Sequence, residues 1–145
     1  MKRQPKDGAT FKGEADLVDS LARELKDEGY RIRVEVSNMG QSIDMVATRG
    51  RWVTVIEAKM QDWRRAVNQC RAHEPVADYI CIAVASVKIS DSLTEEAKRS
   101  GYGIIHYCRT SQKFRWVLRP PRNKRIWAPQ RRHWARGVKR VDYAN

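Results

Sequence analysis

The stretch that decides the fold runs from Ser42 to Gln69, and its first part is SIDMVATRGRWVTVIEAK, residues 42–59. Apolar residues predict a strand over Ile43–Thr48, and β-branched residues predict a second strand over Trp52–Ala58. The basic turn Arg49–Arg51 between them predicts that the two strands pair as a hairpin. A helix is expected to follow, capped by Asp62 and ending near Glu74.

Three charged residues lie at one end of this hairpin. Pairing of the strands brings Asp44 near Glu57, and alternation along a strand projects Glu57 and Lys59 to the same side. Burying two carboxylates and a lysine costs free energy unless something compensates the charge. A divalent metal ion is the simplest compensation. The alternative is a surface salt bridge between Glu57 and Lys59, which would contribute little to stability.

The chain resembles the PD-(D/E)XK nuclease superfamily in the order of these residues: Asp44, a twelve-residue spacer, and then Glu57-Ala58-Lys59. Many members carry a glutamate on an upstream helix and a glutamine on a downstream helix, where this chain has Glu14 and Gln69. Ile43 precedes the aspartate in place of proline, at a position that varies in the superfamily. The resemblance covers roughly Phe11 to Ala85. Its opening Phe-Lys-Gly-Glu and long helix look most like the Holliday-junction-resolvase and restriction-endonuclease-like branches.

This resemblance implies a restriction-endonuclease-like core and a Mg²⁺-dependent DNA endonuclease, with branched DNA as one candidate substrate. Its implied catalytic residues are Glu14, Asp44, Glu57, Lys59 and Gln69. Oxygen ligands suit Mg²⁺, with Mn²⁺ as a substitute, and are expected from Asp44, Glu57 and the backbone carbonyl of Ala58, with Glu14 as a further candidate. A non-cleaving nucleic-acid-binding module on the same scaffold and an RNA-directed nuclease remain as alternatives.

The site residues carry two further expectations. Lys59 would orient or deprotonate the attacking water, or stabilise developing charge, and the sequence leaves these roles open. Glu57 is expected to serve the metal rather than the core, so that Glu57→Ala would stop cleavage and leave folding largely intact. Glu14 lies on an apolar helical arc that includes Ala15 and Val18, and on this helix alone a solvent-facing anion at the helix start is an equal alternative. The presence of the Asp44 set favours a carboxylate that faces the site.

Periodicity predicts the other elements. A helix is expected from Thr10 to about Glu28 with Gly29 as its stop, and a later helix capped by Ser90 is expected to end near Ser100. Further strands are expected at Tyr30–Val36, Asp78–Val87, Ile104–Tyr107 and Phe114–Leu118. The order α-β-β-β-α-β-α-β-β predicts an α/β fold: an antiparallel meander of three strands, a helical crossover to the fourth, and a mixed central sheet flanked by helices.

The charge of the chain indicates its partner. The 145 residues carry a formal net charge of +12, and no basic amphipathic helix with a large apolar face is evident, so nucleic acid is favoured over a membrane surface. Residues 1–118 are expected to form the nuclease-like domain, and residues 119–145 a basic tail with nine Lys or Arg and one acid. The tail would bind DNA as an arm, pack its tryptophans on the core, or do both. Candidate DNA contacts are Arg64, Arg65, Arg71, Arg131, Arg132 and Arg136.

Several classes of protein are not favoured. The odd number of cysteines and the lack of Cys-x-x-Cys spacing argue against a disulfide framework, and Cys70 and Cys81 are expected as buried thiols rather than zinc ligands. No apolar run is long enough to span a bilayer and no signal-peptide pattern is evident, so a cytoplasmic protein without a membrane partner is expected. No glycine-rich phosphate loop is evident, so no nucleotide cofactor is expected. A homodimer is a further candidate assembly.

Overall fold

The computed structural model describes residues 13–60, 62–85, 88–108, 111 and 113–144. The elements in chain order are α1 (Glu14–Asp27), β1 (Arg31–Asn38), β2 (Gln41–Arg49), β3 (Trp52–Lys59), α2 (Trp63–His73), β4 (Tyr79–Val84), α3 (Asp91–Ser100), β5 (Gly103–Cys108), β6 (Lys113–Leu118) and α4 (Ala128–Ala144). The nine expected elements are confirmed in type and order, and α4 is an additional one.

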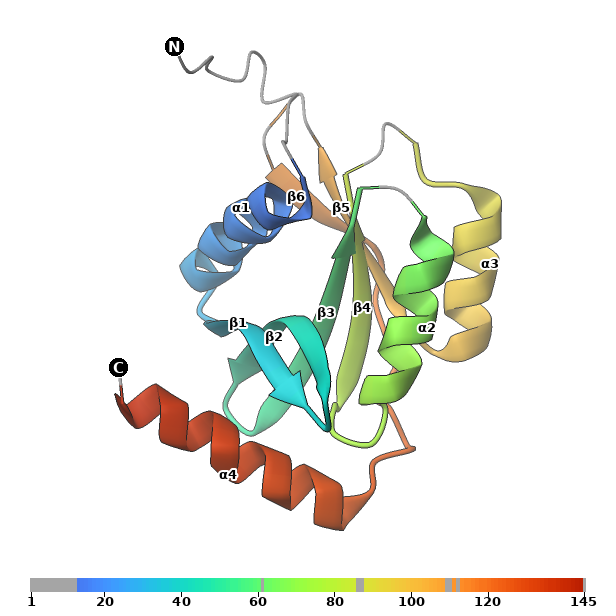
Figure 1. The fold of residues 1–145 in the computed structure, drawn as a ribbon. Helices are drawn as coiled ribbons and strands as arrows, with labels where there is room; N and C mark the ends of the chain where they lie inside the picture. Colours follow the sequence, from blue (N-terminus) through green and yellow to red (C-terminus); the bar gives the residue numbers. More distant parts are fainter. Residues whose placement is uncertain (1–12, 61, 86–87, 109–110, 112, 145) are drawn as a thin grey trace.

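The strands form one six-stranded sheet in the order β1-β2-β3-β4-β5-β6 (Figure 1). The first three strands are antiparallel neighbours, as expected for a meander. The connections through α2 and α3 make β3, β4 and β5 parallel, and β6 returns antiparallel to β5. The predicted mixed α/β sheet with a helical crossover is therefore confirmed.

Helices cover both faces of the sheet, and each face has its own apolar core. On one face, α1 contributes Leu17, Leu21 and Leu25, which pack with strand residues such as Met45 and Ile56. On the other face, α2 and α3 pack over the alternate strand residues (Figure 1). The buried residues of that second core include Ile43, Val55, Ala66, Val67, Cys70, Ile82, Leu93, Ala97, Ile104 and Trp134.

Some local expectations need correction. Leu17 is fully buried on α1, whereas Ala15, which was placed on the apolar arc, is exposed. Asp62 precedes α2 in a left-handed conformation (φ 52°) and its side chain makes no capping hydrogen bond. Ser90 does cap α3, because its hydroxyl accepts a hydrogen bond from the Leu93 amide at 3.1 Å. The expected cap Thr10 and the arc residue Phe11 lie outside the described residues.

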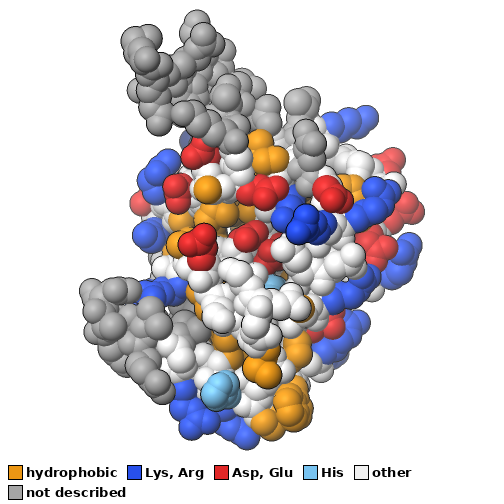
Figure 2. Space-filling model, viewed as in Figure 1, with side chains coloured by type: hydrophobic (Ala, Val, Ile, Leu, Met, Phe, Trp, Pro, Cys, Tyr) orange, Lys and Arg blue, Asp and Glu red, His pale blue; other side chains and the backbone are white. Residues whose placement is uncertain are grey.

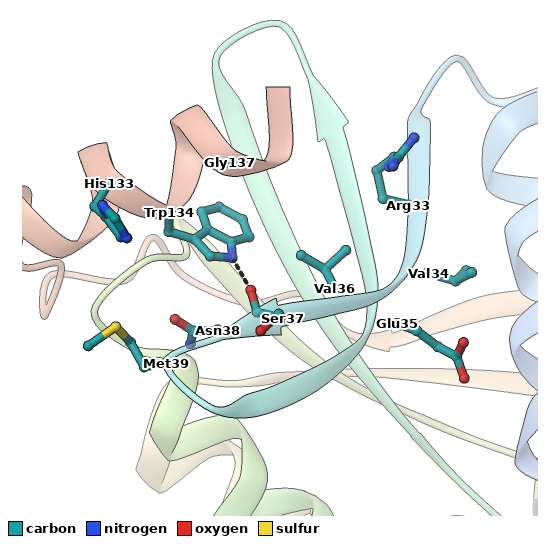
Figure 3. A pocket seen from close by; sticks show the side chains of 10 residues that line it. All are labelled: Arg33, Val34, Glu35, Val36, Ser37, Asn38, Met39, His133, Trp134 and Gly137. Atoms are coloured by element: carbon teal, nitrogen blue, oxygen red, sulfur yellow. Dashed lines mark hydrogen bonds between the residues drawn. The ribbon is translucent and has the colours of Figure 1, made fainter. Parts of the chain in front are cut away.

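Side chains in the first half of the last helix attach it to the rest of the fold. Trp134 is buried and joins the core on the α2 side, while Trp127 stays exposed. Trp134 also donates its indole hydrogen to the carbonyl of Ser37 at the end of β1, at 3.1 Å (Figure 3). The expectation that the C-terminal segment packs a tryptophan on the core is therefore confirmed for Trp134.

The segment between β6 and α4 is fastened to the sheet at Gly103. A Cβ on Gly103 would lie 2.6 Å from Cδ of Pro120 and 2.8 Å from the carbonyl oxygen of Leu118, so no side chain fits there. Beyond this crossing, the Asn123 amide donates to the carbonyls of Glu74 and Ala77 at 2.6 and 2.8 Å. These contacts hold the segment that leads to α4.

Candidate active site

Strand β2 leaves its regular pairing at Asp44. The ladder between β2 and β3 runs from Arg49–Trp52 only as far as Met45–Ile56. On the β1 side, the register skips Glu35 and Asp44, and Glu35 has a positive φ of 53°. Such a backbone conformation is uncommon for a residue other than glycine and is concentrated at functional sites. The backbone N–H group of Asp44 can therefore form a hydrogen bond with a side chain.

Side-chain hydrogen bonds replace the ladder at this point. The Asp44 amide donates to Oε2 of Glu57 at 3.2 Å, and the Ala58 amide donates to Oδ2 of Asp44 at 2.9 Å. Burial raises the pKa of Asp44 to about 6; the Ala58 hydrogen bond opposes the rise, and the Glu57 carboxyl adds to it. The two acids thus lie close enough for their charges to repel, and a cation would relieve that repulsion.

Glu57 is part of the buried interior, and the expectation that it serves a metal stays a prediction. Its side chain has no solvent exposure, and its Oε1 atom has no hydrogen-bond partner among the described residues. A buried acceptor without a partner costs about 1–3 kcal/mol. An oxygen in that state, beside a second carboxylate, fits a hard divalent cation such as Mg²⁺.

The carboxylates form a pair rather than a larger cluster. Among the residues that the structure describes, no three His, Cys, Asp or Glu side chains converge as a metal centre built from side chains alone would require. Asp44 and Glu57 would therefore need a backbone carbonyl, such as that of Ala58, or water to complete a coordination shell. Figure 2 shows acidic side chains gathered on this face of the molecule, between the regions of α1 and α2.

Lys59 and Glu14 lie at the rim of this pair. The Lys59 ammonium is 3.8 Å from Oε1 of Glu14, and the Lys59 side chain is only 12% exposed. Oε2 of Glu14 accepts a hydrogen bond from the Met60 amide at 3.3 Å. Glu14 is exposed but faces the end of β3, where it restrains Lys59 and does not join Asp44 and Glu57 in a three-residue group.

Gln69 and His73 lie one turn apart on α2, the helix that covers this end of β3. Gln69 is partly buried, and its side-chain oxygen is buried without a hydrogen-bond partner among the described residues. His73 is fully buried, and its Nε2 atom lies 3.1 Å from Oε2 of Glu57. His73 was not predicted as a site residue, although it follows Ala66 and Cys70 on the buried face of the helix.

The candidate DNA contacts fall into two groups. Arg64, Arg65, Arg132 and Arg136 are exposed. Arg71 and Arg131 have partners inside the chain: Arg71 pairs with Glu96 at 3.3 Å, and Arg131 pairs with the buried Asp78 at 3.1 Å. Arg131 also donates to the carbonyl of Val76, so it fastens α4 to the loop between α2 and β4.

A second basic surface, which was not predicted from the sequence, lies at the start of β3. There, guanidinium groups stack on aromatic rings: Arg49 lies over Tyr30, Arg51 and Arg122 over Trp52, and Arg119 over Trp116, at 3.9–5.0 Å from the ring centres. These rings line a hollow of about 270 Å³. Trp52 is five residues from Glu57 along β3, which corresponds to about 17 Å.

Comparisons with known proteins support the fold. No family model and no curated protein matches the chain. A solved protein of unknown function from Silicibacter pomeroyi is similar over 97% of this chain and 91% of its own, with 17% identity and a TM-score of 0.61. A second protein of unknown function matches 63% of this chain and 56% of its own, at 20% identity and a TM-score of 0.53.

An XisH family protein from Nostoc punctiforme PCC 73102 is also similar, over 69% of this chain and 97% of its own, with 14% identity and a TM-score of 0.51. At these identities the likeness concerns the fold alone. The mixed six-stranded sheet flanked by helices is consistent with a restriction-endonuclease-like core. Among the described helices, none is long and apolar enough to cross a membrane.

Proposed function

We propose that this chain is a divalent-metal-dependent nuclease that hydrolyses phosphodiester bonds in DNA. One observation carries the proposal. Where the β2–β3 pairing stops, the Asp44 amide donates to Glu57 and the Asp44 carboxylate accepts from the Ala58 amide, and Glu57 keeps a buried oxygen that has no partner among the described residues. The likeness to an XisH family protein, a family with a PD-(D/E)XK-like fold, supports the proposal at the level of the fold.

Asp44, Glu57 and the backbone carbonyl of Ala58 would hold Mg²⁺ or, in its place, Mn²⁺. The bound cation would supply charge compensation and Lewis-acid activation of the phosphate. Lys59, restrained by Glu14, would donate a hydrogen bond to the attacking water or to a phosphate oxygen. Gln69, whose buried side-chain oxygen has no partner among the described residues, would orient water or backbone and would not react.

The substrate assignment rests on charge. The net charge of +12 favours a polyanion, and exposed arginines on α2 and α4 would contact phosphates. Arg64 and Arg65 lie on the helix that carries Gln69 and His73. Arg132 and Arg136 lie on α4. Arg131 pairs with Asp78, so its proposed role is structural rather than contact with DNA. Branched DNA is included among the substrates to be tested.

A cleavage assay tests this function. Purified protein is incubated with linear duplex, four-way branched and single-stranded DNA, and with single-stranded RNA, in Mg²⁺, Mn²⁺ or EDTA. The expected result is metal-dependent cleavage of at least one DNA substrate, absent from Asp44→Asn. DNA binding without cleavage in any metal would favour the non-cleaving module, and cleavage of RNA alone would favour the RNA-directed nuclease.

A further inference from the structure

We propose that His73 is a positioning residue that holds Glu57 ready for a divalent cation, and that α4 supports it through Asn38 and Gln130. The inference rests on the proposed function, because it assigns residues that prepare the same site. Glu57, His73 and Asn38 are all buried, and Gln130 is partly buried on α4. They come from four different elements: β3, α2, β1 and α4.

The direction of the hydrogen bonds follows from a backbone carbonyl. The Asn38 side-chain amide lies 3.3 Å from the carbonyl oxygen of Ala72, which can only accept, so the amide nitrogen must face it. The same nitrogen lies 3.1 Å from Nδ1 of His73. Nδ1 is therefore the acceptor, and Nε2 carries the hydrogen that is donated to Glu57.

Helix α4 completes the series. The Gln130 amide nitrogen lies 3.3 Å from the Asn38 side-chain oxygen, which accepts from it. One turn later, Trp134 donates to the carbonyl of Ser37, next to Asn38 in the chain (Figure 3). Each side chain thus donates to the next, from Gln130 through Asn38 and His73 to Glu57, and α4 holds the end of β1 in place.

This arrangement selects which oxygen of Glu57 is left for a ligand. Oε2 accepts from both His73 and the Asp44 amide, and Oε1 has no partner among the described residues. Two hydrogen bonds to one oxygen fix the plane of the carboxylate and hence the place of the other oxygen. Groups that orient a metal ligand in this way commonly change metal affinity by about 10–100-fold when they are removed.

The test measures Mn²⁺ binding by isothermal titration calorimetry at one pH, with no nucleic acid present. His73→Leu removes the donor and is expected to weaken Mn²⁺ binding by about tenfold or more. His73→Gln can still present an amide hydrogen to Glu57 and is expected to restore most of that loss. Gln130→Leu, on the more accessible helix, is expected to weaken binding by a smaller factor of about two to five, as it acts through two intermediates.

Controls separate positioning from general loss of packing. Cys70→Ala, at a fully buried position on the same helix, should lower the melting temperature measured in EDTA and leave Mn²⁺ affinity unchanged. Asp44→Asn gives the baseline for adventitious binding. Wild-type affinity in a folded His73→Leu protein would overturn the positioning role. If that variant does not fold, wild-type affinity in Gln130→Leu would overturn it instead.

If the proposed function is wrong, the binding and cleavage measurements give a different result from the one expected if only the role of His73 is wrong. A wild-type protein that binds Mn²⁺ no better than Asp44→Asn would contradict the metal site itself, whatever His73 does. A wild-type protein that binds Mn²⁺, loses affinity in His73→Leu and cleaves no nucleic acid would support the positioning role and contradict the nuclease activity.

Discussion

The backbone N–H of Asp44 donates a hydrogen bond to Oε2 of Glu57 at the first position beyond the β2–β3 ladder. The chain itself therefore holds the two acids in register, before any cation is bound. Such preorganisation reduces the reorganisation needed on metal binding, because the ligand oxygens already lie on facing strands. Its cost is electrostatic, since Asp44 is partly desolvated beside a second carboxyl group.

Glu57 is expected to respond differently to two substitutions. Glu57→Gln keeps an oxygen that can accept from His73 and Asp44, so it should fold normally and lose metal binding and cleavage. Glu57→Ala leaves both buried donors without an acceptor and should lower the free energy of unfolding by about 1–3 kcal/mol in EDTA. Denaturant melts of both variants check this, and equal stability of the two would contradict the burial argument.

Asp44 should make the stability of the metal-free protein depend on pH. Its pKa is raised from 3.8 to about 6, so between those values the folded state binds a proton that the unfolded state has released. The free energy of unfolding should therefore fall as pH rises from about 4 to about 6, and level off above that. Because the carboxyl is partly solvated, the expected change is about 1–2 kcal/mol.

The measurement compares wild type with Asp44→Asn in EDTA across this range, since other groups titrate in both proteins. The difference between the two curves isolates Asp44. A difference that stays constant from pH 4 to pH 6.5 would contradict the raised pKa.

Arginines on α4 should separate into DNA contacts and structural residues. In an Asp44→Asn background, Arg132→Glu and Arg136→Glu should each reduce the slope of log affinity against log salt by about one, with little change in melting temperature. Arg131→Glu should instead lower the free energy of unfolding by about 2–4 kcal/mol, because it leaves the buried Asp78 unpaired. An unchanged salt slope in the first two variants would place the DNA contacts elsewhere, with Arg64 and Arg65 tested next.

Two glycines give a matched pair of substitutions. Gly103→Ala would force a methyl group against Pro120 and Leu118, and should cost about 1–3 kcal/mol of stability. Gly137→Ala, in α4 with open space around it, should raise stability by up to about 1 kcal/mol through helix propensity. Thermal unfolding of both variants measures this, and a stable Gly103→Ala protein would mean that the crossing segment can move.

Local patterns were sufficient to predict the hairpin and its charged end. Strand alternation places Glu57 and Lys59, and pairing places Asp44, because both depend on neighbours in the same few residues. His73 was not identified, since its role depends on how α2 is rotated over β3. The pattern around it shows only a residue on the buried face of the helix.

Helix α4 was missed for a different reason. Its basic residues obscure the apolar face, and Pro129, a residue that ordinarily interrupts a helix, lies here in the first turn. Proline is tolerated there because the amides of the first turn have no partner within the helix. The contacts that hold α4 to the sheet link it to residues more than fifty positions earlier, such as Ser37 and Asp78, and no local pattern reports them.

The hydrogen bond from Trp134 to Ser37 also bears on self-association. Strand β1 is an edge of the sheet, and an edge strand presents unpaired backbone groups on which a strand of another molecule can add. The indole occupies one such acceptor, and the left-handed conformation of Glu35 breaks the regular line of the edge. Intermolecular sheet extension through β1 is thereby disfavoured, so a dimer of this chain would be expected to assemble through a different surface.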